Sequence, residues 1–239
     1  FGINDSAQRN IAYNINKTDE IIYIKLGALL NGFFTGIIFF ILLYILSRKV
    51  GEIVNSDSVG LGLKIISPAI IFFTINKIFL GILNGERKIR VYSISQSLRS
   101  ILILSLVVLI SIKFRNAYNL AYSFLITEII LFIYLCSTIK FFHLFKPDIH
   151  KIVYWSKFHI FFGSKSLPIG LFYESYLKID ILMISVFLND YKVGIYSFAA
   201  MFFEGLYQVP HLIKINANPI LVSILKKEKL IKFNKFTKN

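Results

Sequence analysis

The sequence predicts an all-α integral membrane protein with about six transmembrane helices. Of its 239 residues, 56% are hydrophobic and only 17% are charged, whereas soluble domains carry about 25% charged residues. The mean hydropathy is +0.66. The apolar residues form six long runs, and the Lys and Arg residues gather in the connections between those runs.

The first four apolar runs are about as long as a helix that crosses the hydrocarbon core, which needs about 20 residues at 1.5 Å per residue. They are Leu26–Leu46, Leu61–Leu83, Gln96–Ile112 and Tyr118–Ile139. None alternates residue by residue as a membrane β-strand does. A helix also satisfies its own backbone hydrogen bonds, which lipid cannot do. We therefore expect each run to be one transmembrane helix.

The last two apolar runs contain proline. The fifth extends from Phe158 to Leu188, and Pro168 is expected to interrupt its backbone hydrogen bonds because proline has no N–H. The sixth extends from Val193 to Ile213. Apolar residues from 216 to 225 allow this helix to continue beyond a kink at Pro219.

The connections fall into two sets that differ in basic charge. Three Lys or Arg residues precede the first run, three follow the second, four follow the fourth and six lie in the tail after residue 225. Only two follow the first run, two the third and one the fifth. Cytoplasmic connections carry an excess of Lys and Arg. We therefore expect both ends of the chain to be cytoplasmic.

The net charge of +14 could also indicate nucleic-acid binding. A nucleic-acid-binding face, however, gathers basic and stacking aromatic residues on one folded surface. Here the basic residues lie in short connections beside apolar runs, so we expect no nucleic-acid partner.

Catalytic and metal-binding motifs are not found. The sequence contains no HExxH, P-loop, GxSxG or CxxC motif, which makes an enzyme the weaker hypothesis. The spacings among His143, His150 and His159 match no zinc signature. We expect no metal and no other cofactor.

The longest connection between apolar runs extends from Lys140 to Lys157 and contains Pro147. We interpret it as the boundary between two helical lobes. The first lobe then covers residues 1–145, a cytoplasmic linker covers 146–157, and the second lobe covers 158–239. The chain begins without Met, and we expect it to be part of a longer membrane protein.

Carboxylates inside the apolar runs are the main candidates for function. Glu128, Glu174 and Glu204 lie near the centres of the last three runs, where a charge costs about 2.5–3.5 kcal/mol on insertion scales. Such residues usually face a bundle interior or a wet cavity. Glu174 and Lys178 are four residues apart and can pair on one helix face. Tyr173, Tyr176 and Asp180 line a neighbouring face of the same run.

Each of these polar residues also has a simpler interpretation. The carboxylates can form structural hydrogen bonds between helices. The cations near the ends of runs can extend their side chains to the lipid headgroups. Snorkelling is the favoured interpretation for Lys64 and Lys214, and it remains open for Lys77, Arg99 and Lys165.

Several short motifs resemble a known family. They are Phe1-Gly2-Ile3 with residues 7–12, Leu83-Asn84-Gly85 with Arg87, Tyr92 and Arg99, Leu167-Pro168-Ile169-Gly170, residues 178–184, and residues 193–200 with Glu204. Together they resemble the polysaccharide flippases, which handle O-antigen and capsule repeat units. These flippases belong to the superfamily that also holds the multidrug and toxin extrusion (MATE) transporters.

The resemblance implies a MATE-like fold in which two six-helix lobes surround a central cavity, with each lobe incomplete in this chain. It implies a protein of the bacterial inner membrane that moves undecaprenyl-pyrophosphate-linked oligosaccharide to the outer leaflet by alternating access. Its partners would be this lipid-linked oligosaccharide, membrane lipid and a coupling cation, either proton or sodium. The alternatives are an exporter of drugs or other lipid-linked substrates, a membrane enzyme of polysaccharide assembly, and a scaffold without transport.

Under this resemblance the charged residues receive two roles. The cations facing the pyrophosphate would be Lys77, Arg99, Lys165 and Lys178. The residues coupling to the cation would be Glu128, Glu174, Asp180 and Glu204. The motifs include Asp180 and Glu204, whereas the other two carboxylates are chosen for their depth in the membrane.

Overall fold

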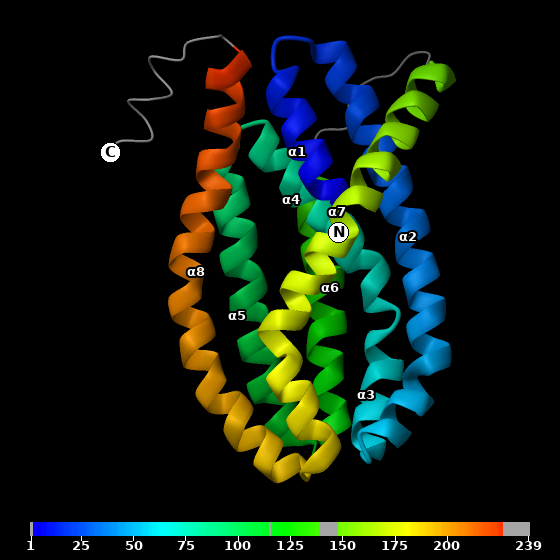
Figure 1. Cartoon of the computed structure of the whole chain (residues 1–239), viewed down its shortest axis with the longest axis vertical. Coiled ribbons are helices and arrows are strands. Elements are labelled where there is room, and N and C mark those ends of the chain that lie inside the picture. Colours follow the sequence, from blue (N-terminus) through cyan, green and yellow to red (C-terminus); the bar gives the residue numbers. More distant parts are fainter. Residues whose placement is uncertain (1, 115, 139–147, 227–239) are drawn as a thin grey trace.

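The computed structural model describes residues 2–114, 116–138 and 148–226, and every regular element in these ranges is a helix. The elements are α1 (Ile3–Tyr13), α2 (Thr18–Ile53), α3 (Asp57–Ile66), α4 (Ala69–Gly85), α5 (Ile89–Lys113), the short 3-10 helix η1 (Ala117–Leu120), α6 (Ala121–Thr138), α7 (Ile149–Phe187) and α8 (Asp190–Lys226). Figure 1 shows the long helices side by side along the long axis of the molecule. The prediction of an all-helical chain is confirmed for the described residues.

Three helical segments are long and apolar enough to cross a membrane, judged by length and composition. They are residues 19–53 of α2, the whole of α5, and η1 with α6. The bent pair α3 and α4 would be a fourth if it forms one broken span. Within the described ranges the structure thus supports three or four spans, and the prediction of six stays a prediction.

The second predicted span is broken in two. We expected one helix from Leu61 to Leu83, but α3 ends at Ile66 and α4 begins at Ala69, with a bend of 55° between them. Pro68 lies in the break, where its missing N–H and its ring prevent a continuous helix. The Ser67 hydroxyl donates a hydrogen bond to the carbonyl oxygen of Lys64 at 2.8 Å and so caps the end of α3 locally.

Helices also form where connections were expected. α1 lies in the N-terminal segment before the first apolar run. α7 begins at Ile149, inside the predicted linker 146–157, and continues through Pro168, where we expected an interruption. α8 continues beyond Pro219 to Lys226, so the predicted extension of the sixth helix is confirmed.

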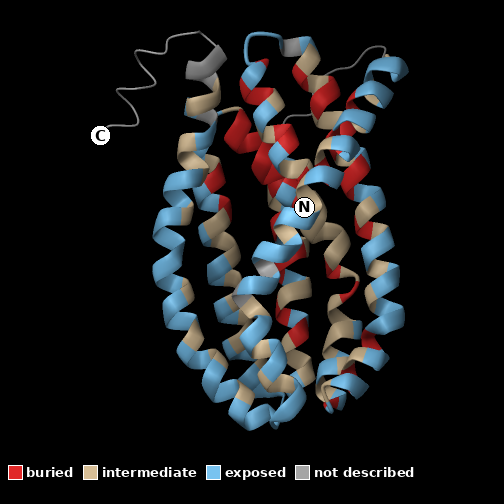
Figure 2. Cartoon of the chain, in the orientation of Figure 1, coloured by how far each residue is buried: buried red, intermediate tan, exposed pale blue. Residues whose placement is uncertain are grey.

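The buried core centres on α4. Its residues Asn76 and 78–85 are all buried, and Figure 2 shows the buried residues concentrated in the half of the molecule that contains α1 and the end of α4. The Thr74 hydroxyl donates a hydrogen bond to the carbonyl oxygen of Gly32 in α2 at 3.1 Å. α4 therefore packs closely against both α1 and α2.

Glycines allow these close approaches. A Cβ atom at Gly81 would lie 2.7 Å from the carbonyl oxygen of Asn4 in α1, and one at Gly85 would lie 2.8 Å from that of Gln8. Because the two glycines are four residues apart, they share one face of α4, which is the small-residue pattern of close helix packing in membranes.

Polar side chains tie the first turns of α7 to α2 and α1. The Trp155 indole N–H donates to Glu20 Oε1 at 2.7 Å, and the Ser156 hydroxyl donates to Asn31 Oδ1 at 2.8 Å. His159 is fully buried. Its Nε2 lies 3.1 Å from the carbonyl oxygen of Ile24, and its Nδ1 lies 2.8 Å from the Ser6 hydroxyl. Because a carbonyl only accepts, Nε2 carries the proton and Nδ1 accepts from Ser6.

Glu86 forms ion pairs at the same end of the molecule, outside the apolar runs. Its carboxylate pairs with the ammonium group of Lys25 in α2 and, at 2.7 Å, with that of Lys88. Burial raises the pKa of Glu86, but the hydrogen bonds and charges of Lys25 and Lys88 together lower it by more. The pKa therefore lies below its ordinary value of 4.5.

We predict that Gly81→Ala destabilises the protein by about 1–3 kcal/mol, because the added methyl group forces α1 away from α4. Gly205→Ala is the matched control, since a Cβ atom at this helical glycine meets nothing within 4 Å. Thermal unfolding in detergent would measure both variants. Equal midpoints for the two would show that the α1–α4 contact does not depend on Gly81.

We predict that Glu86 makes stability depend on pH in the acid range. Its folded pKa is lowered, so its contribution is present above its ordinary value of 4.5 and is lost as the pH falls through the folded pKa. The gap in thermal midpoint between the wild type and Glu86→Gln should therefore shrink from about pH 7 to about pH 3. The control Glu52→Gln alters an exposed carboxylate paired with Arg48. A gap for Glu86→Gln that stays constant with pH would contradict the prediction.

Candidate functional site

A buried ion pair joins α5 and α6. Arg99 Nη2 donates to Glu128 Oε2 at 3.0 Å, with Glu128 fully buried and the Arg99 side chain 12% exposed. Asn76 of α4 completes the arrangement, because its Nδ2 lies 2.8 Å from Glu128 Oε2 and 2.9 Å from the Glu128 carbonyl oxygen. We call Asn76, Arg99 and Glu128 the inner cluster. It ties three helices together.

Part of the inner cluster was predicted from the sequence. Glu128 faces the protein interior, as its central position in an apolar run predicted. Arg99 was expected at the start of a span, but α5 begins at Ile89, which places Arg99 about 15 Å along the helix. Asn76 lies in the second apolar run. Its role as the bridge to Glu128 depends on the packing of α4 against α6.

Phe73 of α4 brings two predicted cations together. The Arg99 guanidinium carbon and the Lys77 ammonium nitrogen each lie 5.4 Å from the centre of the Phe73 ring. This distance is within the range of a cation–π interaction. Lys77 is exposed, so positive charge extends from the buried pair to the protein surface.

The inner cluster keeps unused hydrogen-bonding capacity. Among the described residues, Glu128 Oε1, Arg99 Nε and Asn76 Oδ1 are buried and have no hydrogen-bond partner. Buried polar atoms of this kind are uncommon in folded proteins. Only a conformation that exposes these atoms would let Arg99 donate to a further anion, or let Glu128 accept from a proton donor or contact a cation.

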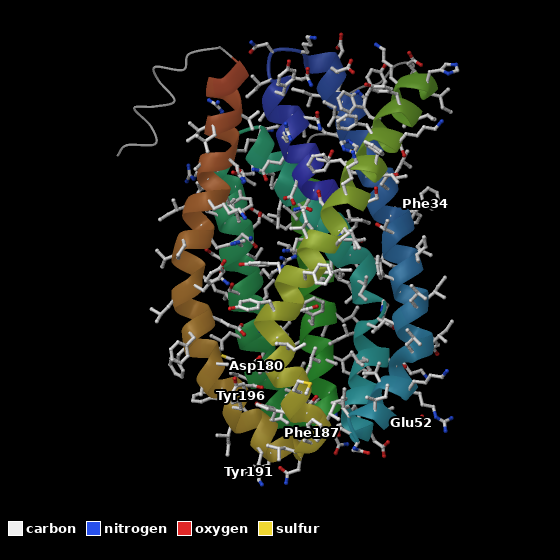
Figure 3. The ribbon with its side chains drawn as sticks, in the orientation of Figure 1. Phe34, Glu52, Asp180, Phe187, Tyr191 and Tyr196 are labelled. Atoms are coloured by element: carbon white, nitrogen blue, oxygen red, sulfur yellow. The ribbon has the colours of Figure 1, made fainter. Side chains whose placement is uncertain are left out.

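A second group of polar residues joins α7 and α8. Each contact pairs one side chain of each helix: Lys178 with Glu204, Tyr173 with Tyr207, and Asp180 with Tyr196. We call these six residues the hairpin cluster. Figure 3 shows Asp180 and Tyr196 beside one another between the two helices. The Lys178 and Glu204 side chains are about half exposed, unlike the inner cluster.

Of the remaining predicted site residues, Lys165 belongs to neither cluster. Lys178 pairs with Glu204 across the helices, and its possible pairing with Glu174 within α7 stays a prediction. The side chain of Glu174 lies outside the described residues. Lys165 is exposed on α7, with its ammonium nitrogen 4.0 Å from the centre of the Phe161 ring.

Residues 28–226 match the family described as polysaccharide biosynthesis protein. The chain belongs to this family. The matched range runs from α2 to the end of α8 and contains every predicted site residue. No curated protein and no solved structure matches the chain. Family membership and the apolar helices together indicate a membrane protein of polysaccharide biosynthesis.

In the described part of this polysaccharide biosynthesis protein, no group of three or more His, Cys, Asp or Glu residues could hold a metal ion. Of the three histidines considered in the sequence, His143 lies outside the described residues. His150 is the second residue of α7, and its N–H donates to Asp148 Oδ1 at 2.9 Å.

We predict that replacing only one residue of the Arg99–Glu128 pair strongly lowers the free energy of unfolding. Arg99→Leu or Glu128→Leu alone should destabilise this polysaccharide biosynthesis protein by about 3–5 kcal/mol, because the partner charge stays buried. The double variant should be less destabilised than the two single effects added together. Unfolding measurements on the four proteins in detergent would give the coupling energy.

The matched control for this cycle is Lys178 with Glu204. Because both side chains are half exposed, each single replacement there should cost about 0–1 kcal/mol. Additive effects in the Arg99–Glu128 cycle would contradict the buried pair as the joint between α5 and α6.

Proposed function

We propose that this protein moves undecaprenyl-pyrophosphate-linked oligosaccharide repeat units across the bacterial inner membrane by alternating access. The supporting observation is the inner cluster, which holds Arg99 between helices and links it through Phe73 to Lys77. This is transport, and no covalent bond of the substrate changes.

The chemistry of the substrate explains the need for cations inside the bundle. A pyrophosphate group loses its hydration when it leaves water, and lipid offers no compensation. Arg presents a planar set of donors that suits phosphate oxygens, and Lys supplies a compact point charge. Arg99 Nε is buried and has no hydrogen-bond partner, so a conformation that exposes it during transport would let Arg99 contact phosphate and keep its bond to Glu128.

The charged residues divide into two proposed roles. Lys77, Arg99, Lys165 and Lys178 are the cations that face the pyrophosphate. Glu128, Glu174, Asp180 and Glu204 couple the movement to a proton or sodium ion. Because Lys178 and Glu204 already pair across α7 and α8, an anion that binds Lys178 competes with Glu204 and so frees a carboxylate for the coupling ion.

The proposed arrangement in the membrane has six spans, with α7 and α8 as the last two. At 1.5 Å per residue each exceeds the roughly 30 Å of the hydrocarbon core. The turns after α1 and α4 lie at one end of the molecule, and the α2–α3 and α7–α8 turns lie at the other (Figure 1). The end with more Lys and Arg is assigned to the cytoplasm, which places the α1–α2 connection and the end of α8 on the cytoplasmic side. In a two-lobe, MATE-like arrangement, residues 1–145 and 158–239 belong to different lobes.

We expect deletion of the gene to leave complete lipid-linked repeat units that are reached by reagents only from the cytoplasmic face. The measurement is sugar labelling in oriented membrane vesicles, with lipid extraction. A lack of lipid-linked repeat units would instead indicate an enzyme of their synthesis. Repeat units on the outer face that stay unpolymerised would indicate a polymerase. Either result would overturn the proposal.

Point variants test the cation role. Lys77→Ala and Lys178→Ala should each lower surface polysaccharide at least tenfold at equal expression, a loss equivalent to about 1.4 kcal/mol. The control is Lys64→Ala, since Lys64 lies over the Tyr44 ring and is assigned to headgroup contact. Normal polysaccharide from both test variants would remove Lys77 and Lys178 from substrate binding.

A further inference from the structure

One polar contact joins the two turns at the end of the molecule opposite the basic turns. The Ser56 hydroxyl, between α2 and α3, donates to Asp190 Oδ2 at 2.9 Å. Asp190 is the first residue of α8. In Figure 3, Glu52 and Tyr191 mark the two sides of this end of the molecule.

Ser56 is held in place by the backbone around it. Its N–H donates to the carbonyl oxygen of Gly51 at 2.9 Å, and Asn55 before it adopts a left-handed conformation with φ of 52°. This pattern ends α2 as a Schellman motif. The Ser56 hydroxyl oxygen also accepts from the Val59 N–H at 3.4 Å and so caps α3. The hydroxyl is therefore presented by a rigid corner.

Asp190 is fixed in a similar way. Asn189 Oδ1 accepts from the Lys192 N–H at 3.2 Å, and the Asn189 carbonyl oxygen accepts from the Val193 N–H at 3.1 Å. The carboxylate of Asp190 thus lies in the first turn of α8, where the helix dipole favours negative charge. Two preformed corners meet in a single charge-assisted hydrogen bond.

Little else holds the corners together. A hollow lined by Val54, Asn55 and residues 186–191 lies between the two turns, so their apolar surfaces do not pack fully. Among the hydrogen bonds and ion pairs of the described residues, the Ser56–Asp190 bond is the one that links these turns. A joint of this kind can open without disturbing the core around α4.

We propose that Ser56 and Asp190 form a latch that holds the α7–α8 hairpin against the α2–α3 corner. Its part in transport rests on the proposed function, in which this end faces away from the cytoplasm. There the latch keeps the outer side closed, and its opening is the step that releases the lipid-linked product. Ser56 and Asp190 are positioning residues, because they set the conformation and do not touch the substrate.

The test measures the distance between the two corners in the full chain, reconstituted in lipid nanodiscs. Spin labels are attached to cysteines that replace the exposed residues Glu52 and Tyr191, in a Cys136→Ala background. Pulsed electron paramagnetic resonance then measures the distance between the two labels. The distance distribution gives the ratio of molecules with separated corners to molecules with closed corners. Ser56→Ala and Asp190→Ala should each raise this ratio on the order of tenfold, within the usual range of coupling between sites.

Two controls make the result specific to the pair. Asp57→Asn changes an exposed carboxylate beside Ser56 and should leave the distances unchanged. The double variant Ser56→Ala/Asp190→Ala should separate the corners no more than either single variant, because both remove the same bond. Asp190→Ala preserves the cap of α3, so it tests the latch even where Ser56→Ala weakens that helix.

The distance measurement contains no substrate, which separates the two proposals. Unchanged distances in both single variants would overturn the latch, whatever the transport assays show. Separated corners support the latch. If the gene-deletion experiment then places the protein outside transport, the proposed function fails while the latch remains.

Discussion

The close approach of α4 to its neighbours is the constraint on which the rest of the structure depends. Gly81 and Gly85 let the backbone of α1 lie against one face of α4, and Thr74 bonds to the backbone of α2. Lipid supplies no hydrophobic force that drives helices together, so such packing and hydrogen bonds between helices must hold them. Because α4 is fixed at the centre, Asn76 contacts Glu128 of α6 and Phe73 contacts Arg99 of α5.

The two clusters differ in the environment of their charges. Glu128 is fully buried and shares its oxygen between Arg99 and Asn76, so the inner cluster behaves as a rigid joint. Lys178 and Glu204 are half exposed and lie on the α7–α8 hairpin, where competition from another ion costs less. The half-exposed pair can therefore exchange partners more easily than the buried one.

Much of the fold and part of the site could be predicted from the pattern of residues. Hydropathy predicted helices throughout, and the central position of Glu128 predicted that it faces the interior. The bend at Pro68 was missed because hydropathy averages over a break of two residues. α1 was missed because it is short and weakly apolar, and its burial comes from contacts with α2, α4, α7 and α8. The Lys178–Glu204 pair could not be predicted from spacing, because its two residues lie on different helices.

The sequence by itself determined that this chain is helical and suited to a membrane, because run length and the distribution of charge depend only on the order of residues. The tertiary structure decided which charges meet. Arg99 and Glu128 are 29 residues apart, and Ser56 and Asp190 are 134 apart. Such contacts follow from how the helices pack, which depends on side-chain shape across separate segments and not on any local pattern.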